Sequence, residues 1–196
     1  DPEDVEGRLA SVGKPLIGTD LLILDDQDQV CPAGVPGEIV GRGRIVMAEY
    51  NRRSDANAEA TWTDPAGRRW LRTGDVGKLD EDGFLYLVDR KKDLIISGGQ
   101  NIYPADIETV LLEHPDVLEV AVIGVDSERW GESPLAVVVL EHSEADTAAI
   151  MSWTNERVGK QQRVAGVVSI NELPRNPNGK VLKRELRDMY RGRLSE

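Results

Sequence analysis

Residues 117–140 read VLEVAVIGVDSERWGESPLAVVVL, and this stretch decides how the second half of the chain folds. Its two ends, residues 117–125 and 135–140, are nearly continuous aliphatic runs. Such runs are typical of strands that are buried on both faces, because they reserve no position for water. We therefore expect two strands at the centre of a small sheet, with helices covering it.

Helical patterns surround these strands. Pro104 suits the first turn of a helix, and Asp106 and Glu108 favour its positive N-terminal end. A second helix is expected over residues 146–158, and a third near the end of the chain, where apolar residues recur at i, i+4, i+7 and i+8. A short strand is expected at residues 167–170. The side chains predicted to face inward are Ile107, Val110, Leu111, Ile150, Trp153, Leu182, Leu186, Met189 and Tyr190.

The first half of the chain reads as short strands joined by turns. An apolar run at residues 21–24 ends at an aspartate-rich turn, and residues 31–37 hold two prolines and two glycines, which indicates a loop. A hairpin is expected around residues 80–83. We predict the fold class α+β: a β-rich segment over residues 1–89, followed by a compact α+β domain over residues 90–196 with a small central sheet and flanking helices.

Composition excludes several classes of function. Acidic residues outnumber basic ones by 35 to 24, and the resulting net charge of −11 argues against nucleic-acid binding. The single cysteine, Cys31, forms neither an internal disulfide nor a cysteine-based zinc site. We predict no metal site, since His114 and His142, both expected to face solvent, are too few for one. The four tryptophans are expected to be packing residues. With no transmembrane run and an acidic N-terminus, we expect a cytoplasmic protein.

Two polar stretches lie near the boundary between the halves. LRTGD ends in Asp75, and a carboxylate beside a glycine at a strand end can accept hydrogen bonds from two adjacent ribose hydroxyls. The alternative is a strand-ending turn capped by the aspartate. DRKKD, at residues 89–93, suits a solvated connector and equally a hinge, whose residues must stay in water while φ and ψ change.

Two further stretches lie in the second half. SGGQN, at residues 97–101, contains paired glycines that either close a plain hairpin turn or let the backbone approach a ligand. PRNPNGK, at residues 174–180, is a rigid loop that presents Lys180. This lysine is either a surface charge or a cation delivered to a site elsewhere. Phosphoryl and adenylyl transfer need such a cation against the developing negative charge.

Together, four motifs in this order resemble the adenylate-forming superfamily, which contains acyl-CoA synthetases, peptide-synthetase adenylation domains and luciferases. The motifs are PGEIVGRGRIVMAEYN, LRTGDVG, GFLYLVDRKKDLIISGGQNIYPADIE and LPRNPNGKVLKREL. The resemblance covers essentially the whole chain, and it is to the C-terminal portion of the family. It implies that residues 1–89 end a large N-terminal domain, which is otherwise missing here, and that residues 90–196 form its small mobile C-terminal domain.

The resemblance also implies roles for individual residues. Asp75 and Arg90 match the residues that contact the ribose of ATP and of the acyl-adenylate. Lys92 falls at the hinge about which the C-terminal domain rotates between two half-reactions. Gly98 and Gly99 match the loop that lines the pantetheine path in thioester formation. Finally, Lys180 matches the catalytic lysine that bridges the carboxylate substrate and the α-phosphate.

The implied reaction has two steps. A small carboxylic acid and ATP, bound with Mg²⁺, give acyl-AMP and pyrophosphate, and CoA as co-substrate then displaces AMP. We expect a C-terminal fragment of an acyl-CoA synthetase for a fatty or aromatic acid, inactive without the missing N-terminal domain. Asp89, where peptide-synthetase domains often have glycine, favours this branch, whereas residues 161–164 depart from a common Tyr-Lys-x-Pro pattern. The alternatives are an adenylation domain that loads a carrier protein and a non-catalytic binding module of the same fold.

Overall fold

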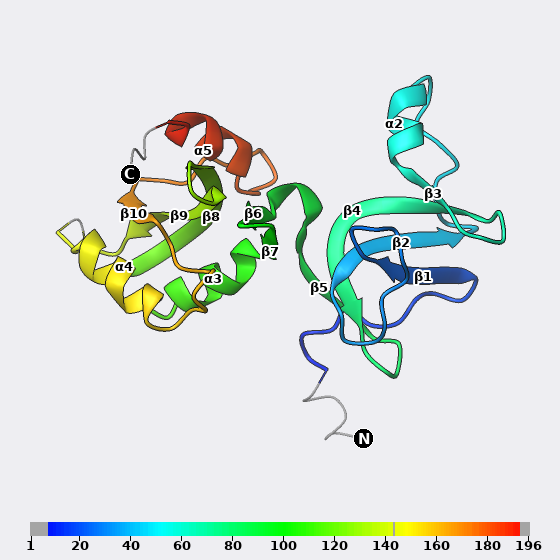
Figure 1. The fold of residues 1–196 in the computed structure, drawn as a ribbon, viewed down its shortest axis with the longest axis horizontal. Coiled ribbons are helices and arrows are strands. Elements are labelled where there is room, and N and C mark those ends of the chain that lie inside the picture. Colours follow the sequence, from blue (N-terminus) through cyan, green and yellow to red (C-terminus); the bar gives the residue numbers. More distant parts are fainter. Residues whose placement is uncertain (1–7, 143, 193–196) are drawn as a thin grey trace. The chain divides into compact units, whose positions relative to one another are not determined.

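The computed structural model of the protein describes residues 8–142 and 144–192. The chain divides between Lys92 and Asp93 into two compact units, which we call unit 1 and unit 2 (Figure 1). Unit 1 consists mainly of strands, and unit 2 combines a sheet with helices, so the predicted α+β class is confirmed. No helix in the described residues is long and apolar enough to cross a membrane. Most of the acidic N-terminus discussed above, residues 1–7, lies outside the described part.

Unit 1 is a five-stranded antiparallel sheet in the order β1-β2-β4-β3, with β5 also paired to β4. The eleven-residue β4 is therefore the strand on which three neighbours assemble. Adjacent residues such as Ile23 and Leu24 belong to two different small apolar clusters, as expected for a strand whose successive side chains point to opposite faces. The elements are β1 (Thr19–Leu24), β2 (Gly37–Gly43), α2 (Ser54–Glu59), β3 (Thr61–Thr63), β4 (Arg69–Leu79) and β5 (Leu85–Arg90).

The largest core side chain of unit 1 is Trp70, which is 3% exposed. Its indole N–H donates a 3.0 Å hydrogen bond to Asp64, and the Trp62 ring packs against it with ring centroids 6.2 Å apart. Burial opposes ionisation of Asp64, but hydrogen bonds from Trp70 and Arg68 lower its pKa to about 2. For this pair of tryptophans, the expected packing role is confirmed.

Unit 2 contains a second five-stranded sheet, in the order β10-β9-β6-β7 with β8 also paired to β9. β8 and β9 form a long antiparallel ladder from the pair Val117–Leu140 to the pair Ser127–Gly131, and β10 runs parallel to β9. The elements are β6 (Ile95–Ser97), β7 (Gln100–Ile102), α3 (Pro104–Leu111), β8 (Val117–Ser127), β9 (Gly131–Leu140), α4 (Thr147–Asn155), β10 (Gly166–Ser169) and α5 (Lys183–Tyr190).

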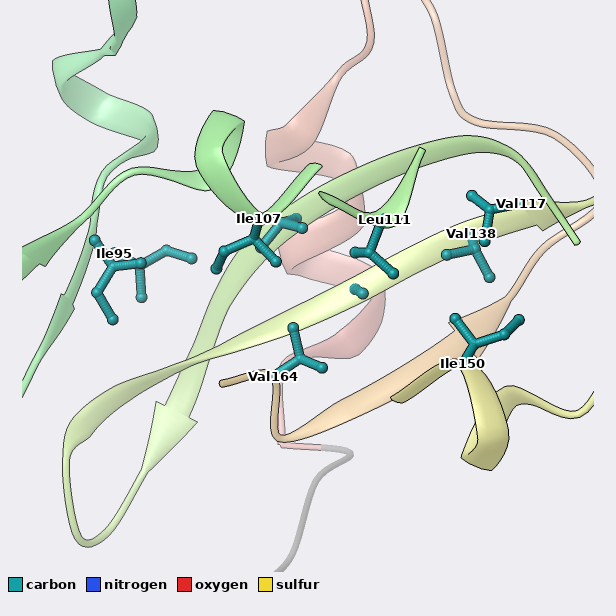
Figure 2. Packing of buried hydrophobic residues seen from close by; sticks show 10 residues of the cluster. Ile95, Ile107, Leu111, Val117, Val138, Ile150 and Val164 are labelled. Atoms are coloured by element: carbon teal, nitrogen blue, oxygen red, sulfur yellow. The ribbon is translucent and has the colours of Figure 1, made fainter. Parts of the chain in front are cut away.

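The β8–β9 ladder is buried on both faces, as the aliphatic runs predict. One face packs against α3 and α4, and Figure 2 shows the side chains that meet there. The other face packs against α5 through Leu186, which is fully buried. On the first face lie Ile95, Ile102, Ile107, Leu111, Val117, Val122, Ala136, Val138, Ile150 and Val164; on the second lie Ala121, Ile123, Val125, Leu135, Val137, Val139, Leu173 and Leu186.

Two expectations for unit 2 are wrong in detail. Glu108 does not serve the N-terminus of α3: its carboxylate accepts the backbone N–H of Val122 at 2.7 Å and pairs with Lys183 at 2.7 Å. It therefore covers an exposed edge of β8, which a one-dimensional helix pattern cannot reveal. His114 does not face solvent, because the turn after α3 brings its ring edge-on to Trp153, with centroids 5.0 Å apart.

We predict that Leu186→Ala destabilises unit 2 by about 3 kcal/mol, because it opens a cavity under α5 at the one side chain of this helix that is fully buried. Met189 of the same helix, which the sequence pattern placed on the inward face, is instead 44% exposed. Met189→Ala is therefore the control, and its effect should stay within about 0.5 kcal/mol. Native-state hydrogen exchange of the β8 and β9 amides gives both values. Equal losses in the two variants would contradict this packing.

Candidate active site

Asp75 is placed by an irregularity inside β4. Glu38 pairs with Val76 and Val40 pairs with Arg72, so the single residue Ile39 faces three residues of β4, 73–75. Gly74 adopts a φ of +71°, which the bulge requires and which L side chains rarely adopt. The expectation of a strand end at Asp75 is thus wrong: the strand continues, and the bulge turns this segment out of the ladder.

The bulge is held by its own threonine. The Thr73 hydroxyl donates to the carbonyl of Ile39 at 2.9 Å and accepts the N–H of Asp75 at 3.1 Å. These two hydrogen bonds fix the backbone that carries the Asp75 carboxylate. Bulges of this kind re-aim a side chain at functional sites.

Asp75 and Arg90 are brought together by strand pairing. They are directly opposite residues of β4 and β5, and Arg90 Nε lies 2.7 Å from Asp75 Oδ1. The pair is accessible, with 34% of the Asp75 side chain and 45% of the Arg90 side chain exposed. An accessible carboxylate that a neighbouring guanidinium holds in place is suited to accept hydrogen bonds from a diol.

The junction between the two units is anchored on each side by an ion pair. Lys91 Nζ lies 2.8 Å from Glu38, a residue of β2 that is only 6% exposed and also binds Arg72. Asp93, 7% exposed, accepts from Arg187 of α5 at 3.0 Å. Lys92 between them is exposed, and its side chain makes no hydrogen bond or ion pair in the part of the chain that the structure describes.

Gly98 and Gly99 form the two-residue turn of the hairpin between β6 and β7. Both have positive φ, +56° and +78°, as a type I′ turn demands. The Gly98 N–H donates to the Trp130 carbonyl at 2.8 Å, and a Cβ at Gly98 would lie 3.0 Å from the Trp130 ring. A Cβ at Gly99 would meet nothing. The hairpin reading of this stretch is correct, and its open side is at Gly99.

Lys180 is presented by a tight loop that holds itself together. The Asn176 side-chain oxygen accepts the N–H groups of Asn178 and Lys180 at 3.0 and 2.9 Å. Arg175 donates to the Gly179 carbonyl at 2.7 Å and to Glu119 of β8 at 2.8 Å. Lys180 itself is exposed, and its ammonium group has no partner within residues 8–142 and 144–192. The loop is therefore rigid while its cation is free.

Sequence reasoning missed the residues that position these features. The sequence assigns no role to Glu38, Asp93, Glu119 or Arg175, although Asp93 and Arg175 lie inside two of the motifs and Glu38 carries a signal of its own. Glu38 directly precedes the apolar residues Ile39 and Val40 in β2, and a carboxylate in such a place must be paired to be buried. The partners of the others come from distant segments and leave no local pattern. Groups of three or more potential metal ligands are not found among the described residues.

Comparison with known proteins adds to this geometry. Residues 106–180 match the AMP-binding enzyme C-terminal domain family. The chain is 46% identical to a 2-succinylbenzoate–CoA ligase of Geobacillus kaustophilus over 95% of this chain and 37% of that protein. It is 39% identical to the long-chain-fatty-acid–CoA ligase FadD13 of Mycobacterium tuberculosis over 96% of this chain and 36% of that protein.

A solved structure is also similar. The o-succinylbenzoate CoA synthetase of Bacillus subtilis, in complex with its acyl-adenylate intermediate, matches with a TM-score of 0.82 at 42% identity. The match covers 99% of this chain and 39% of that one. The chain belongs to the adenylate-forming superfamily, in its acyl-CoA synthetase branch, and corresponds to the C-terminal portion of those enzymes. It spans a little over a third of the length of the curated relatives that it matches.

Proposed function

We propose that this chain is the C-terminal portion of an ATP-dependent acyl-CoA ligase that activates a fatty or aromatic carboxylic acid. The observation that carries the proposal is the accessible Asp75–Arg90 pair beside the β4 bulge. The names of the relatives support it, since they are CoA ligases for an aromatic acid and for long-chain fatty acids. In this proposal, unit 1 ends a larger N-terminal domain and unit 2 is the mobile domain of a cytoplasmic enzyme, so the boundary lies three residues after the expected one at residue 89.

Nucleotide binding falls to Asp75 and Arg90. The guanidinium of Arg90 holds the accessible carboxylate of Asp75 at 2.7 Å, and this carboxylate accepts hydrogen bonds from the ribose hydroxyls of ATP and of the acyl-adenylate. Because this acceptor is already held in place, it does not have to reorient when the nucleotide binds. Mg²⁺ would enter with ATP as part of the substrate, because hard divalent cations bind to phosphate oxygens with few protein ligands.

Lys180 supplies the cation of the first half-reaction. As the carboxylate attacks the α-phosphate, negative charge accumulates on the transferred group and on pyrophosphate. A free ammonium on a rigid loop can meet that charge without first breaking an existing ion pair. In the second half-reaction, the Gly98–Gly99 turn lines the path of the CoA thiol, and the absence of side chains keeps that path open.

The two loops of unit 2 are attached to different ends of the β8–β9 ladder. The Lys180 loop is tied to Glu119, whereas the glycine turn is tied to β9 at Gly131, opposite Ser127. Eight residues of extended strand separate Glu119 from Ser127, about 27 Å of strand. This separation supports a mechanism in which unit 2 presents one loop and then, after rotation at Lys92, the other.

The second candidate is an adenylating enzyme whose acyl acceptor is a carrier protein. A CoA ligase and a carrier-loading enzyme would form acyl-AMP with the same residues, so the two differ only in the thiol that accepts the acyl group. Assaying acyl transfer to CoA and to a phosphopantetheine-bearing carrier protein separates the two. A non-catalytic binding module is the third alternative. The unpaired Lys180 on its rigid loop argues against it, because a binding module does not need a cation held ready for phosphoryl chemistry.

We predict that the 196-residue chain alone does not adenylate a carboxylic acid. Asp75 and Arg90 contact only part of a nucleotide, and the chain covers about a third of its relatives, so the acid and the triphosphate are not positioned. Carboxylate-dependent exchange of ATP with labelled pyrophosphate measures the activity, with the full-length protein as the positive control. Exchange by the chain alone above the no-enzyme background would refute the prediction.

We predict that Lys180→Ala in the full-length protein slows adenylation roughly 10²- to 10³-fold and leaves the thioester half-reaction nearly unchanged. Gly98→Leu should do the reverse, because its side chain collides with Trp130 and distorts the turn on the thiol path. Lys160→Ala removes an exposed charge elsewhere in unit 2 and is the control. Each half-reaction is assayed separately, the second from synthetic acyl-adenylate and CoA. Equal slowing of both halves by Lys180→Ala would overturn the assigned role.

We predict that Lys92→Pro slows the complete reaction while adenylation stays near the parent rate. Proline fixes φ at about −65°, and Lys92 is the residue that neither neighbouring ion pair restrains. Lys92→Ala keeps the backbone free and is the matched control. Pre-steady-state measurement of acyl-AMP and of acyl-CoA shows which step slows. A normal complete reaction in the proline variant would place the hinge elsewhere.

A further inference from the structure

The hairpin that carries Gly98 and Gly99 is attached to the main sheet of unit 2 by few backbone contacts. Its strand β6 pairs with β9 at a single residue pair, Ser97 and Gly131. One further backbone hydrogen bond runs from the Gly98 N–H to the Trp130 carbonyl, 2.8 Å long. On the other side of Ser97, at Ile96, the hydrogen bond to the backbone is made by a side chain instead of by the partner strand.

That side chain belongs to Glu132. Its Oε2 accepts the backbone N–H of Ile96 at 2.8 Å, where a carbonyl of the partner strand would otherwise serve. The Glu132 carboxylate also rests against Gly124 of β8, where a Cβ would lie 3.1 Å from it. Because Gly124 has no side chain, the Glu132 carboxylate has room to lie beside it and reach β6.

The position of Glu132 is electrostatically unfavourable. It lies directly opposite Asp126 in the β8–β9 ladder, and like charges in such a pair destabilise a sheet. A neutral or basic residue there would suit the sheet better. A charge-assisted hydrogen bond to Ile96 offsets that repulsion, and it fixes the middle residue of β6, which pairs with Asn101 of β7.

We propose that Glu132 is a positioning residue for the second half-reaction: through Ile96, it sets the approach of the Gly98–Gly99 turn to the thiol. This inference rests on the proposed function, because it assigns the turn to thioester formation. With Glu132 in place, the hairpin is held at Ile96 by a carboxylate and at Gly98 by the Trp130 carbonyl, on both sides of the single ladder pair. Without it, β6 is held on one side only and the turn is free to shift.

The test compares Glu132→Ala, Glu132→Gln and Glu128→Ala in the full-length protein. Displacement of a reacting-site loop by about 1 Å slows a reaction up to roughly 100-fold, so Glu132→Ala should slow the thioester half-reaction by roughly 10- to 100-fold and leave adenylation unchanged. Glu132→Gln should restore most of the rate, because its amide oxygen accepts the same N–H. Glu128, an exposed residue of the same β8–β9 turn, is the control for loss of a carboxylate.

A second variant leaves Glu132 intact. Gly124→Ala adds a methyl group 3.1 Å from the carboxylate and should displace it, giving a smaller loss in the same half-reaction. Hydrogen exchange of the Ile96 amide is the readout that does not depend on activity. It should become faster in Glu132→Ala and Gly124→Ala and stay slow in Glu132→Gln, with the unfolding midpoint of unit 2 unchanged.

The outcomes are separable. Slowing of both half-reactions by Glu132→Ala, no rescue by glutamine, or an effect no larger than that of Glu128→Ala would each overturn the positioning role. If the unmodified protein forms acyl-AMP but passes the acyl group to no thiol, the proposed function fails instead. In that case, hydrogen exchange of the Ile96 amide still tests the contact on which this inference depends. An unchanged exchange rate in Glu132→Ala would refute that contact.

Discussion

The antiparallel ladder between β8 and β9 is the interaction on which unit 2 depends. Both faces of the ladder are covered with aliphatic side chains, so neither can be left to water. Two helices close one face and α5 closes the other, which explains why α5 lies where it does despite its strongly charged sequence. Because both faces are apolar, the register depends on how the side chains of each face fit the helices that cover it.

The same ladder carries the loops that we assign to the chemistry. Glu119 near one end holds Arg175 and, through it, the loop of Lys180. Gly131 and Glu132 at the other end hold the glycine hairpin. Neither loop needs a core of its own, since each is fastened to a rigid strand by one or two polar contacts. Loops held in this way can be precisely positioned while the ammonium group of Lys180 stays unpaired and the backbone at Gly99 stays accessible.

The junction between the units follows a different principle. Buried carboxylates restrain the residue on each side of Lys92, Glu38 holding Lys91 and Asp93 held by Arg187. A buried carboxylate that loses its partner is costly, so both contacts are expected to persist through any movement of the chain. Change of backbone conformation is thereby concentrated at one exposed residue. This arrangement gives a physical reason for a hinge of single-residue length in the mechanism proposed here.

The sequence by itself determined the α+β class, the two buried strands, the helices beside them and the glycine turn, because each depends on a local pattern of burial or on backbone freedom. It also pointed to Asp75, Arg90 and Lys180, through a resemblance carried by motifs. Only the tertiary structure decided how these residues are held. The bulge at Asp75 depends on β2 lying alongside, the edge-covering role of Glu108 depends on β8, and the contact of Glu132 with Ile96 joins residues far apart in the chain. The partner of a polar side chain is set by which elements pack together, so the residues next to it in the sequence do not indicate which partner it has.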